Sequence, residues 1–328
     1  MWRCANIPRM SRLLSEVEEK RMKKSYTGAL YLSIAASIWG GMYVVSKYAL
    51  DLIPPMTLLF ARYILASILL GIICHFKQIP LLSLLRSKTS GQRILLWQIG
   101  LIGYFLSISA QFWGTKLSSA HMGSLITTLS PIFLSLFAVI LLKEKMTPKQ
   151  MFALVLASLG VVIIIGLPGL TGDQSVVAGS VVLIIAAVSW GYYSAIARKA
   201  SQIYLPLQMT TLGIWIATAC TFPTLLWEWG SWDWKDLFSW PIILSCLYLG
   251  IVSTAVAFFS WNKGLSLTPS HQAGLFFFLQ PVVGSLLGWL MLDEHLSLSF
   301  FIGSILIFSA VYLSMTKKKR DPQMTVKP

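Results

Sequence analysis

The chain contains ten apolar segments of about 20 residues each, and this feature limits its fold more than any other. A helix of about that length just crosses the hydrocarbon core of a bilayer. We therefore predict an all-α integral membrane protein with ten transmembrane helices. The predicted spans are residues 27–47, 55–76, 94–115, 119–142, 150–168, 178–198, 205–227, 241–262, 269–291 and 297–316.

The composition supports a membrane protein. Hydrophobic residues make up 56% of the 328 residues and charged residues only 12%, whereas soluble domains carry about 25% charged residues. The net charge of +14 is spread between the apolar runs, so we expect contacts with anionic lipids and no nucleic-acid partner. No metal or cofactor is expected, because none of the four cysteines has CxxC spacing; they are Cys4, Cys74, Cys220 and Cys246.

The distribution of positive charge predicts the orientation in the membrane. If the N-terminus is cytoplasmic, only three of the 26 Lys and Arg residues face outside: Lys47, Lys116 and Lys235. Arg62 falls within the second span, and the remaining 22 face the cytoplasm. Positive residues concentrate in cytoplasmic loops, so we predict a multi-pass protein of the cell membrane with both termini cytoplasmic. Met22 is a candidate natural start, which would make residues 1–21 an upstream extension.

The two halves of the chain are similar at an offset of about 150 residues. Trp39-Gly40 matches Trp190-Gly191, Pro131 matches Pro281, and further pairs follow in the same order. Each half has five spans, an odd number, so the second half enters the membrane in the opposite sense. We predict two inverted five-helix repeats, 27–168 and 178–316, flanked by a cytoplasmic segment 1–26 and a basic cytoplasmic tail 317–328. Inverted repeats are typical of secondary transporters.

Four short motifs strengthen this interpretation. They are residues 35–40 (AASIWG), residues 60–63 (FARY), Ser130-Pro131 followed by residues 143–147 (KEKMT), and Gln280-Pro281 followed by residues 293–297 (DEHLS). With these motifs the chain resembles the EamA-like branch of the drug/metabolite transporter superfamily over residues 27–316. The resemblance implies transport of small organic metabolites such as amino acids or drugs, often outward, without fixing one substrate. Asp293 stands where such proteins often have Gly, a departure that we expect to affect only the loop.

Six side chains are candidates for substrate binding. Trp39 and Trp190 fall near the middle of matched spans, where they either line a central cavity or pack against their neighbouring glycines. Tyr104 and Gln111 share one face of the third span, and Gln280 is the best polar candidate in the ninth. Such polar groups face either a path or a neighbouring helix.

Arg62 is the only charged side chain well inside a predicted span. It either binds a substrate carboxylate or has a structural role, hydrogen-bonding carbonyls at helix ends. Pro131 and Pro281 lie in the middle of their predicted spans, and each either kinks a helix for gating or is simply tolerated. The oligomeric state stays open, with a monomer among the alternatives.

Proton coupling and enzymatic activity are not favoured by the sequence. No predicted span holds an acidic residue away from its ends, and His121 and His271 lie near opposite surfaces. A membrane enzyme needs paired carboxylates, a metal cluster or an activated nucleophile. We therefore expect no catalytic residues and predict a transporter working by alternating access. The alternatives are an intramembrane enzyme and a receptor or scaffold.

Overall fold

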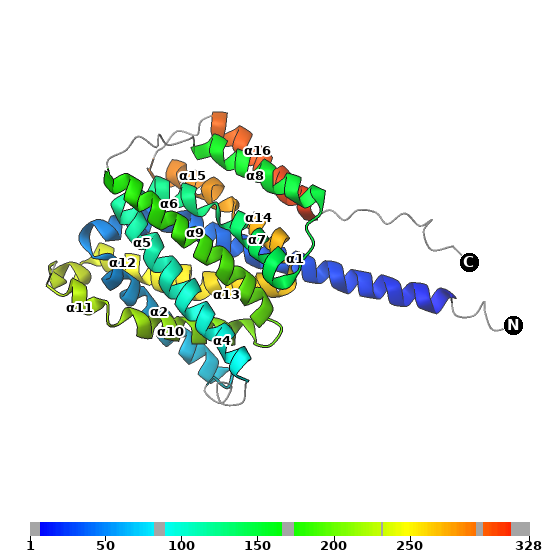
Figure 1. Ribbon diagram of the computed structural model, residues 1–328, viewed down its shortest axis with the longest axis horizontal. Coiled ribbons are helices and arrows are strands. Elements are labelled where there is room, and N and C mark those ends of the chain that lie inside the picture. The colour runs from blue at the N-terminus through cyan, green and yellow to red at the C-terminus, as the bar shows by residue number, and fades with distance from the viewer. Residues whose placement is uncertain (1–6, 82–88, 166–173, 231, 293–297, 316–328) are drawn as a thin grey trace.

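The computed structural model describes residues 7–81, 89–165, 174–230, 232–292 and 298–315, and all their regular elements are helical (Figure 1). The first half contains α1 (Ile7–Leu52), α2 (Pro55–Phe76), α4 (Ser90–Gln98), η1 (Ile99–Leu106), α5 (Ser107–Leu117), α6 (Ala120–Thr127), α7 (Ser130–Leu142) and α8 (Pro148–Ile165). The second contains α9 (Gln174–Ala200), α10 (Pro206–Thr221), α11 (Leu225–Glu228), η2 (Trp234–Phe238), α12 (Trp240–Leu247), η3 (Tyr248–Val256), α13 (Ala257–Leu267), α14 (Ser270–Phe276), α15 (Leu279–Leu292) and α16 (Leu298–Met315).

Seven helical stretches of the described chain are long and apolar enough to cross a membrane. They are Lys23–Leu52, Pro55–Phe76, Ser90–Leu117, Met122–Leu142, Gln174–Ala200, Trp240–Leu267 and Leu298–Met315. The other three predicted segments are also helical but fall short of this measure: α8, α10, and α14 followed by α15. The chain is therefore a multi-pass helical membrane protein.

The two halves share their departures from regular α-helix. The π-helical segments η1 and η3 begin at residues 99 and 248, within otherwise α-helical stretches. The helix also breaks between α6 and α7 and again between α14 and α15. Each break comes just before one of the matched prolines, Pro131 and Pro281. These matched irregularities follow the offset of about 150 residues seen in the sequence.

The sequence pattern predicted Pro131 and Pro281 in the middle of helices, but each of them lies near the start of a helix. Pro131 occupies the first turn of α7, and Pro281 is the third residue of α15. Proline has no N–H to donate but fits the first turn of a helix, where no intrahelical partner is needed. The preceding helices accordingly end in tight turns, with Leu129 N–H bonding Ile126 O and Phe278 N–H bonding Leu275 O.

Helices α1 and α13 run in opposite directions. A Cβ at Gly28, near the start of the packed part of α1, would lie 3.0 Å from the Leu267 Cβ at the end of α13. Further along α1, the Trp39 indole N–H donates to the Ser253 carbonyl, which precedes α13. From Gly28 to Trp39 the residue numbers rise along α1, whereas those of their partners fall from Leu267 to Ser253, so the helices are antiparallel.

Helices α9 and α13, in contrast, run in the same direction. The Trp261 indole donates to Ser194 Oγ at 3.1 Å, and Arg198 donates to the Leu265 carbonyl at 2.7 Å. Matched helices α1 and α9 therefore cross the bundle in opposite senses, as Figure 1 also shows.

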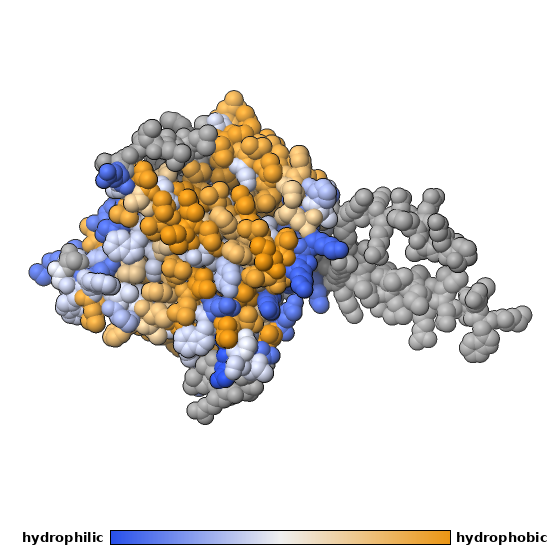
Figure 2. Space-filling view, in the orientation of Figure 1, coloured by the Kyte–Doolittle hydropathy of each residue, from blue (hydrophilic) through white to orange (hydrophobic). Residues whose placement is uncertain are grey.

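The packed part of α1 begins at the end of the bundle where α16 ends. Gly28 of α1 lies against Leu267, and Gln272, which follows shortly after Leu267, donates to the Ser314 carbonyl near the end of α16. Figure 2 shows hydrophilic residues gathered at the edge where α1 leaves the bundle, whereas apolar residues cover much of the surface between the ends. A bilayer would bury that apolar surface.

Candidate functional site

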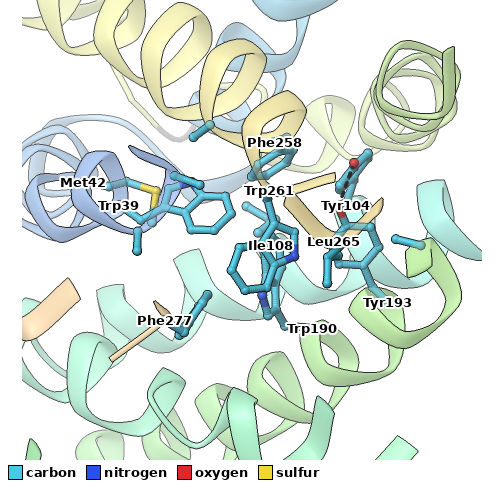
Figure 3. Close-up of a cluster of buried hydrophobic side chains, with 14 of the residues drawn as sticks. Trp39, Met42, Tyr104, Ile108, Trp190, Tyr193, Phe258, Trp261, Leu265 and Phe277 are labelled. Atoms are coloured by element: carbon cyan, nitrogen blue, oxygen red, sulfur yellow. Dashed lines mark hydrogen bonds between the residues drawn. The ribbon is translucent and has the colours of Figure 1, made fainter. Parts of the chain in front are cut away.

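Aromatic rings from both halves meet in the middle of the bundle (Figure 3). Trp39 of α1 and Trp190 of α9 make an edge-to-face contact with ring centroids 5.1 Å apart. Phe258 and Trp261 of α13 and Phe277 pack around this pair at centroid distances of 5.6 to 6.3 Å. Edge-to-face contacts at such distances are favourable. We call these five residues the aromatic cluster.

A small cavity opens beside the aromatic cluster, between the halves. Its lining includes Trp39 and Met42 of α1, Ser107 and Gln111 of α5, Ser130 of α7, Trp190 of α9, Phe258, Phe277 and Gln280. The structure thus brings together four predicted binding residues: Trp39, Gln111, Trp190 and Gln280. The space open to the centre of a water molecule is about 20 Å³, roughly enough for one water. The helices must separate before a larger molecule can enter.

Several buried polar atoms around this cavity have no hydrogen-bond partner among the residues that the structure describes. They are both amide atoms of Gln280, the indole nitrogen of Trp190 and the hydroxyl of Ser130. Gln280 is 2% exposed and Trp190 6% exposed. Leaving such a group unsatisfied costs about 1–3 kcal/mol. A ligand that supplied both a donor and an acceptor would remove this cost, so the arrangement is suited to binding a polar part of a small molecule.

The glycines beside the two tryptophans serve helix packing. A Cβ at Gly40 would lie 2.8 Å from the Gln280 carbonyl oxygen, and one at Gly191 would lie 2.5 Å from Phe133 Cβ. Only glycine permits this approach of α1 to α15 and of α9 to α7. The sequence left packing and cavity lining as alternatives for the Trp-Gly pairs; in the structure the glycines pack and the tryptophans line the cavity.

Tyr104 lies outside the cavity, in a buried polar network. Its hydroxyl is 2.9 Å from the Tyr193 hydroxyl and accepts from the Asn262 amide at 2.8 Å. Its ring stacks on Phe258 with centroids 4.7 Å apart. Gln111 lines the cavity and Tyr104 does not, and the π-helical segment η1 ends between the two residues. Asn262 was not among the predicted site residues, although an amide within an apolar run is a signal of a buried polar site.

Arg62 is fully buried beside the cavity rather than in its lining. Its Nε donates to Thr254 Oγ1 at 2.7 Å, and its guanidinium lies over the rings of Phe112 and Phe258, 5.3 and 6.0 Å from their centroids. Its Nη2 has no hydrogen-bond partner. The structural role expected from the sequence was hydrogen bonding to carbonyls at helix ends; among the described residues the guanidinium instead donates to Thr254 Oγ1 and the Met42 sulfur.

Pro131 and Pro281 lie where the two broken helices pass the aromatic cluster. Pro131, Trp190, Trp261 and Phe277 surround a second, narrower gap in the packing. A gating role for the two prolines is untested and stays a prediction.

A polar cluster links the two halves at the end of the bundle where α7 and α9 finish. Glu144 accepts from the backbone N–H and the hydroxyl of Ser270, each at 3.1 Å. Its carboxylate lies 3.4 Å from His271 Nδ1 and 3.9 Å from Arg198 Nε. We call Glu144, Arg198, Ser270 and His271 the latch. It joins the first half, through Glu144, to the second half.

The latch carboxylate is held in its ionised form. Burial disfavours the charge, but hydrogen bonds from His271 and Ser270 outweigh burial, so the pKa of Glu144 lies below its ordinary value. His271 also hydrogen-bonds Gln150 of α8. His271 therefore belongs to the latch and not to the cavity. The side chain of His121, its sequence match, lies outside the described residues.

A second carboxylate joins the halves at the opposite end of the bundle. Glu228 of α11 accepts from the backbone N–H groups of Met56 and Thr57 at 3.0 and 2.7 Å and from the Thr57 hydroxyl at 2.9 Å. These groups lie at the start of α2, where a negative charge is favoured. No pattern in the sequence signals this contact, because its partners are far apart along the chain.

Comparison with known proteins assigns the chain to a family. It is 24% identical to YetK, an uncharacterized transporter of Bacillus subtilis, over 91% of this chain and 90% of YetK. It is 25% identical to an uncharacterized transporter of Archaeoglobus fulgidus, over 88% of this chain and 97% of that protein. A shorter Bacillus subtilis protein, the permease-like YdzE, is 53% identical over 23% of this chain and 96% of its own length.

A solved structure shares the fold. A crystal structure described only as that of a protein superposes with a TM-score of 0.70 at 21% identity, over 88% of this chain and 96% of that one. The model of the EamA-like transporter family matches twice, at residues 26–166 and 177–316. These two matches coincide with the two halves that meet at the aromatic cluster, and together they cover most of the chain, which thus belongs to the EamA-like transporter family.

Proposed function

We propose that this protein exports small organic molecules across the cell membrane by alternating access. In this proposal ten helices span the bilayer as two inverted five-helix repeats, with both termini cytoplasmic. The cavity beside Trp39 and Trp190 is the substrate site, and it opens to one side of the membrane at a time. The predicted outward direction rests on the family resemblance.

The course of the helices supports the inverted repeat. Matched helices α1 and α9 run in opposite senses, as the odd number of spans per repeat requires. The shorter helical segments then complete the five spans of each repeat: α8 in the first repeat, and α10 and α14–α15 in the second. The cytoplasmic position of the termini is supported by Lys and Arg residues near the latch end, such as Lys143, Arg198 and Lys263.

The single observation that carries the proposal is the cavity itself. It lies between the halves, its walls are aromatic, and Gln280, Trp190 and Ser130 present unpartnered polar atoms there. Such a site suits a small molecule with an apolar body and a few polar groups. The latch joins the halves at the predicted cytoplasmic end, and breaking its contacts would let the halves separate there.

An intramembrane enzyme is less well supported. The residues that line the cavity include no Asp, Glu, His or Cys that could act as a general base, nucleophile or metal ligand. A receptor or scaffold would need neither a cavity between the halves nor matched breaks in both halves.

Flux measurements in proteoliposomes test the proposed function. Candidate solutes, including amino acids, nucleosides and drugs, are screened for uptake and efflux by the wild-type protein. Trp39→Ala and Trp190→Ala should each reduce flux of a transported solute at least tenfold. The matched control is Trp113→Ala, because Trp113 lies on the exposed surface of α5 with 41% exposure. Equal flux in all three variants, each folded in the membrane, would contradict the proposed site.

A further inference from the structure

Arg62 carries a buried charge for which the described part of the chain offers no counter-ion. Its side chain is 0% exposed, and the ion pairs of the described residues involve other groups. Its neighbours are a hydroxyl, a thioether and three aromatic rings. Burying an unpaired charge is costly, so a role for the positive charge itself has to be considered.

Only one layer of side chains separates this charge from the cavity. Arg62 Nη1 lies 3.9 Å from the sulfur of Met42, and the guanidinium carbon lies 6.0 Å from the centroid of Phe258. Met42 and Phe258 both line the cavity. The guanidinium therefore sits behind the cavity wall, where its field reaches a bound molecule through a medium of low polarity.

An aromatic site without Arg62 would favour organic cations. Trp and Phe rings attract ammonium groups through their π-faces, and sites built from several such rings bind quaternary ammonium ligands. Here the guanidinium already lies over Phe258, one of the rings in the wall. Among the cavity's lining residues no carboxylate is present to offset the positive field.

We infer that Arg62 is a specificity-determining residue that makes the cavity reject cations. The substrate class is accordingly apolar or aromatic molecules that are uncharged or carry a carboxylate, with hydrogen-bonding groups for Gln280 and Trp190. This inference rests on the proposed function, because it describes what the same cavity selects. Arg62 acts at a distance, so it needs no direct contact with the substrate.

The size of the effect follows from electrostatics. For a bound charge about 8 Å from the guanidinium and an effective dielectric constant of about 20, the binding constant changes about 30-fold. The change has opposite signs for a cation and an anion. Removing the charge should therefore alter the ratio of anion to cation affinity by far more than it alters the affinity for a neutral molecule.

The test measures binding to the purified full-length protein by calorimetry. The probes are phenylacetate, 2-phenylethanol and 2-phenylethylammonium, which have similar size and differ in charge. The wild-type protein should bind the cation at least tenfold more weakly than the neutral or anionic probe. Arg62→Gln should improve cation binding relative to the other two by at least tenfold, and Arg62→Lys, which keeps the charge, should preserve the wild-type order.

Thr254→Val is the matched control, since it removes the hydrogen bond to Arg62 but leaves the charge in place. Its order of affinities should remain that of the wild type. The inference is overturned if the wild-type protein binds the cation as tightly as the neutral probe, or binds none of the three. Equal binding of the cation and the neutral probe would be seen with the wild-type protein alone, so this result does not depend on whether Arg62→Gln folds.

Binding and flux separate the two proposals. If the charge order is found but no solute is transported in proteoliposomes, the proposed function fails and the charge selectivity stands. If transport is found but folded Arg62→Gln keeps the wild-type charge order, the selectivity inference fails and the transport function stands.

Discussion

Trp39 and Trp190, one from each half of the chain, meet edge to face with their ring centroids 5.1 Å apart. Their indole nitrogens differ in environment, because that of Trp39 donates to the Ser253 carbonyl at 3.0 Å and that of Trp190 has no partner. The two matched residues therefore line one cavity in different ways. A ligand can gain a hydrogen bond from Trp190 without breaking an existing one.

Gln280→Met should stabilise the protein and impair transport. Both amide atoms of Gln280 are buried without partners, and an apolar side chain of similar size would remove the cost of about 1–3 kcal/mol. The same change removes the hydrogen-bonding groups that we assign to the substrate. We expect a higher midpoint of thermal unfolding together with flux reduced at least tenfold.

Asn262→Leu provides the contrasting variant. The Asn262 amide donates to Tyr104 and Thr210 at 2.8 Å and its carbonyl accepts from Tyr193 at 2.8 Å. Loss of the Asn262 amide leaves those groups unsatisfied, so the free energy of unfolding should fall by about 1–3 kcal/mol. A stability loss for Gln280→Met as large as that for Asn262→Leu would contradict the assignment of Gln280 as an unsatisfied group.

Gly40→Ala and Gly191→Ala should each destabilise the protein by about 1–3 kcal/mol through overpacking. The added methyl groups would lie 2.8 Å from the Gln280 carbonyl oxygen and 2.5 Å from Phe133 Cβ. Chemical denaturation in mild detergent measures the loss. Gly91→Ala is the control, because no atom lies within 4 Å of a Cβ there. Equal stability of all three variants would show that the helices have room to adjust.

The helical segments could be predicted from the sequence because hydropathy and length decide them. The contact between Trp39 and Trp190 could also be predicted from the repeat, because matched positions near the middle of the membrane lie close together where the two halves pack. Tyr104 was predicted to line the cavity but lies in the neighbouring polar network, and the π-helical segment η1 to which it belongs has no signal in the residue pattern. The contacts of Glu228 with the start of α2 depend on tertiary packing and could not be foreseen.

The latch should weaken in acid. Its native contacts lower the pKa of Glu144 from an ordinary value of 4.5. A carboxylate with a depressed native pKa stabilises the fold above its unfolded pKa, and this contribution disappears as the pH falls through the native value. We expect Glu144→Gln to lower stability by about 1–3 kcal/mol at pH 7.

Thermal unfolding from pH 7 down to pH 3.5 measures this dependence. The difference between the wild type and Glu144→Gln should shrink as the pH falls below about 4.5. Lys145→Gln, an exposed neighbour of the latch, should leave the pH profile unchanged. A difference that persists undiminished at pH 3.5 would show that the ionised carboxylate is not what holds the latch.

Transport should not be driven by a proton gradient. Proton coupling normally needs a titratable carboxylate or histidine in the path, and the lining of the cavity contains neither. An imposed pH gradient across proteoliposomes should therefore produce no accumulation of a transported solute, and flux should vary little between pH 6 and 8. Strong accumulation that His271→Ala abolishes would instead make the latch histidine a coupling residue.

Access to the cavity from each side of the membrane tests alternating access most directly. In a variant whose four cysteines are replaced, Ser130→Cys places one thiol in the cavity lining, and a membrane-impermeant maleimide is added to one side of oriented proteoliposomes at a time. We predict labelling from both sides, with a transported solute slowing both reactions. Labelling from one side only, under all conditions, would contradict alternating access through this cavity.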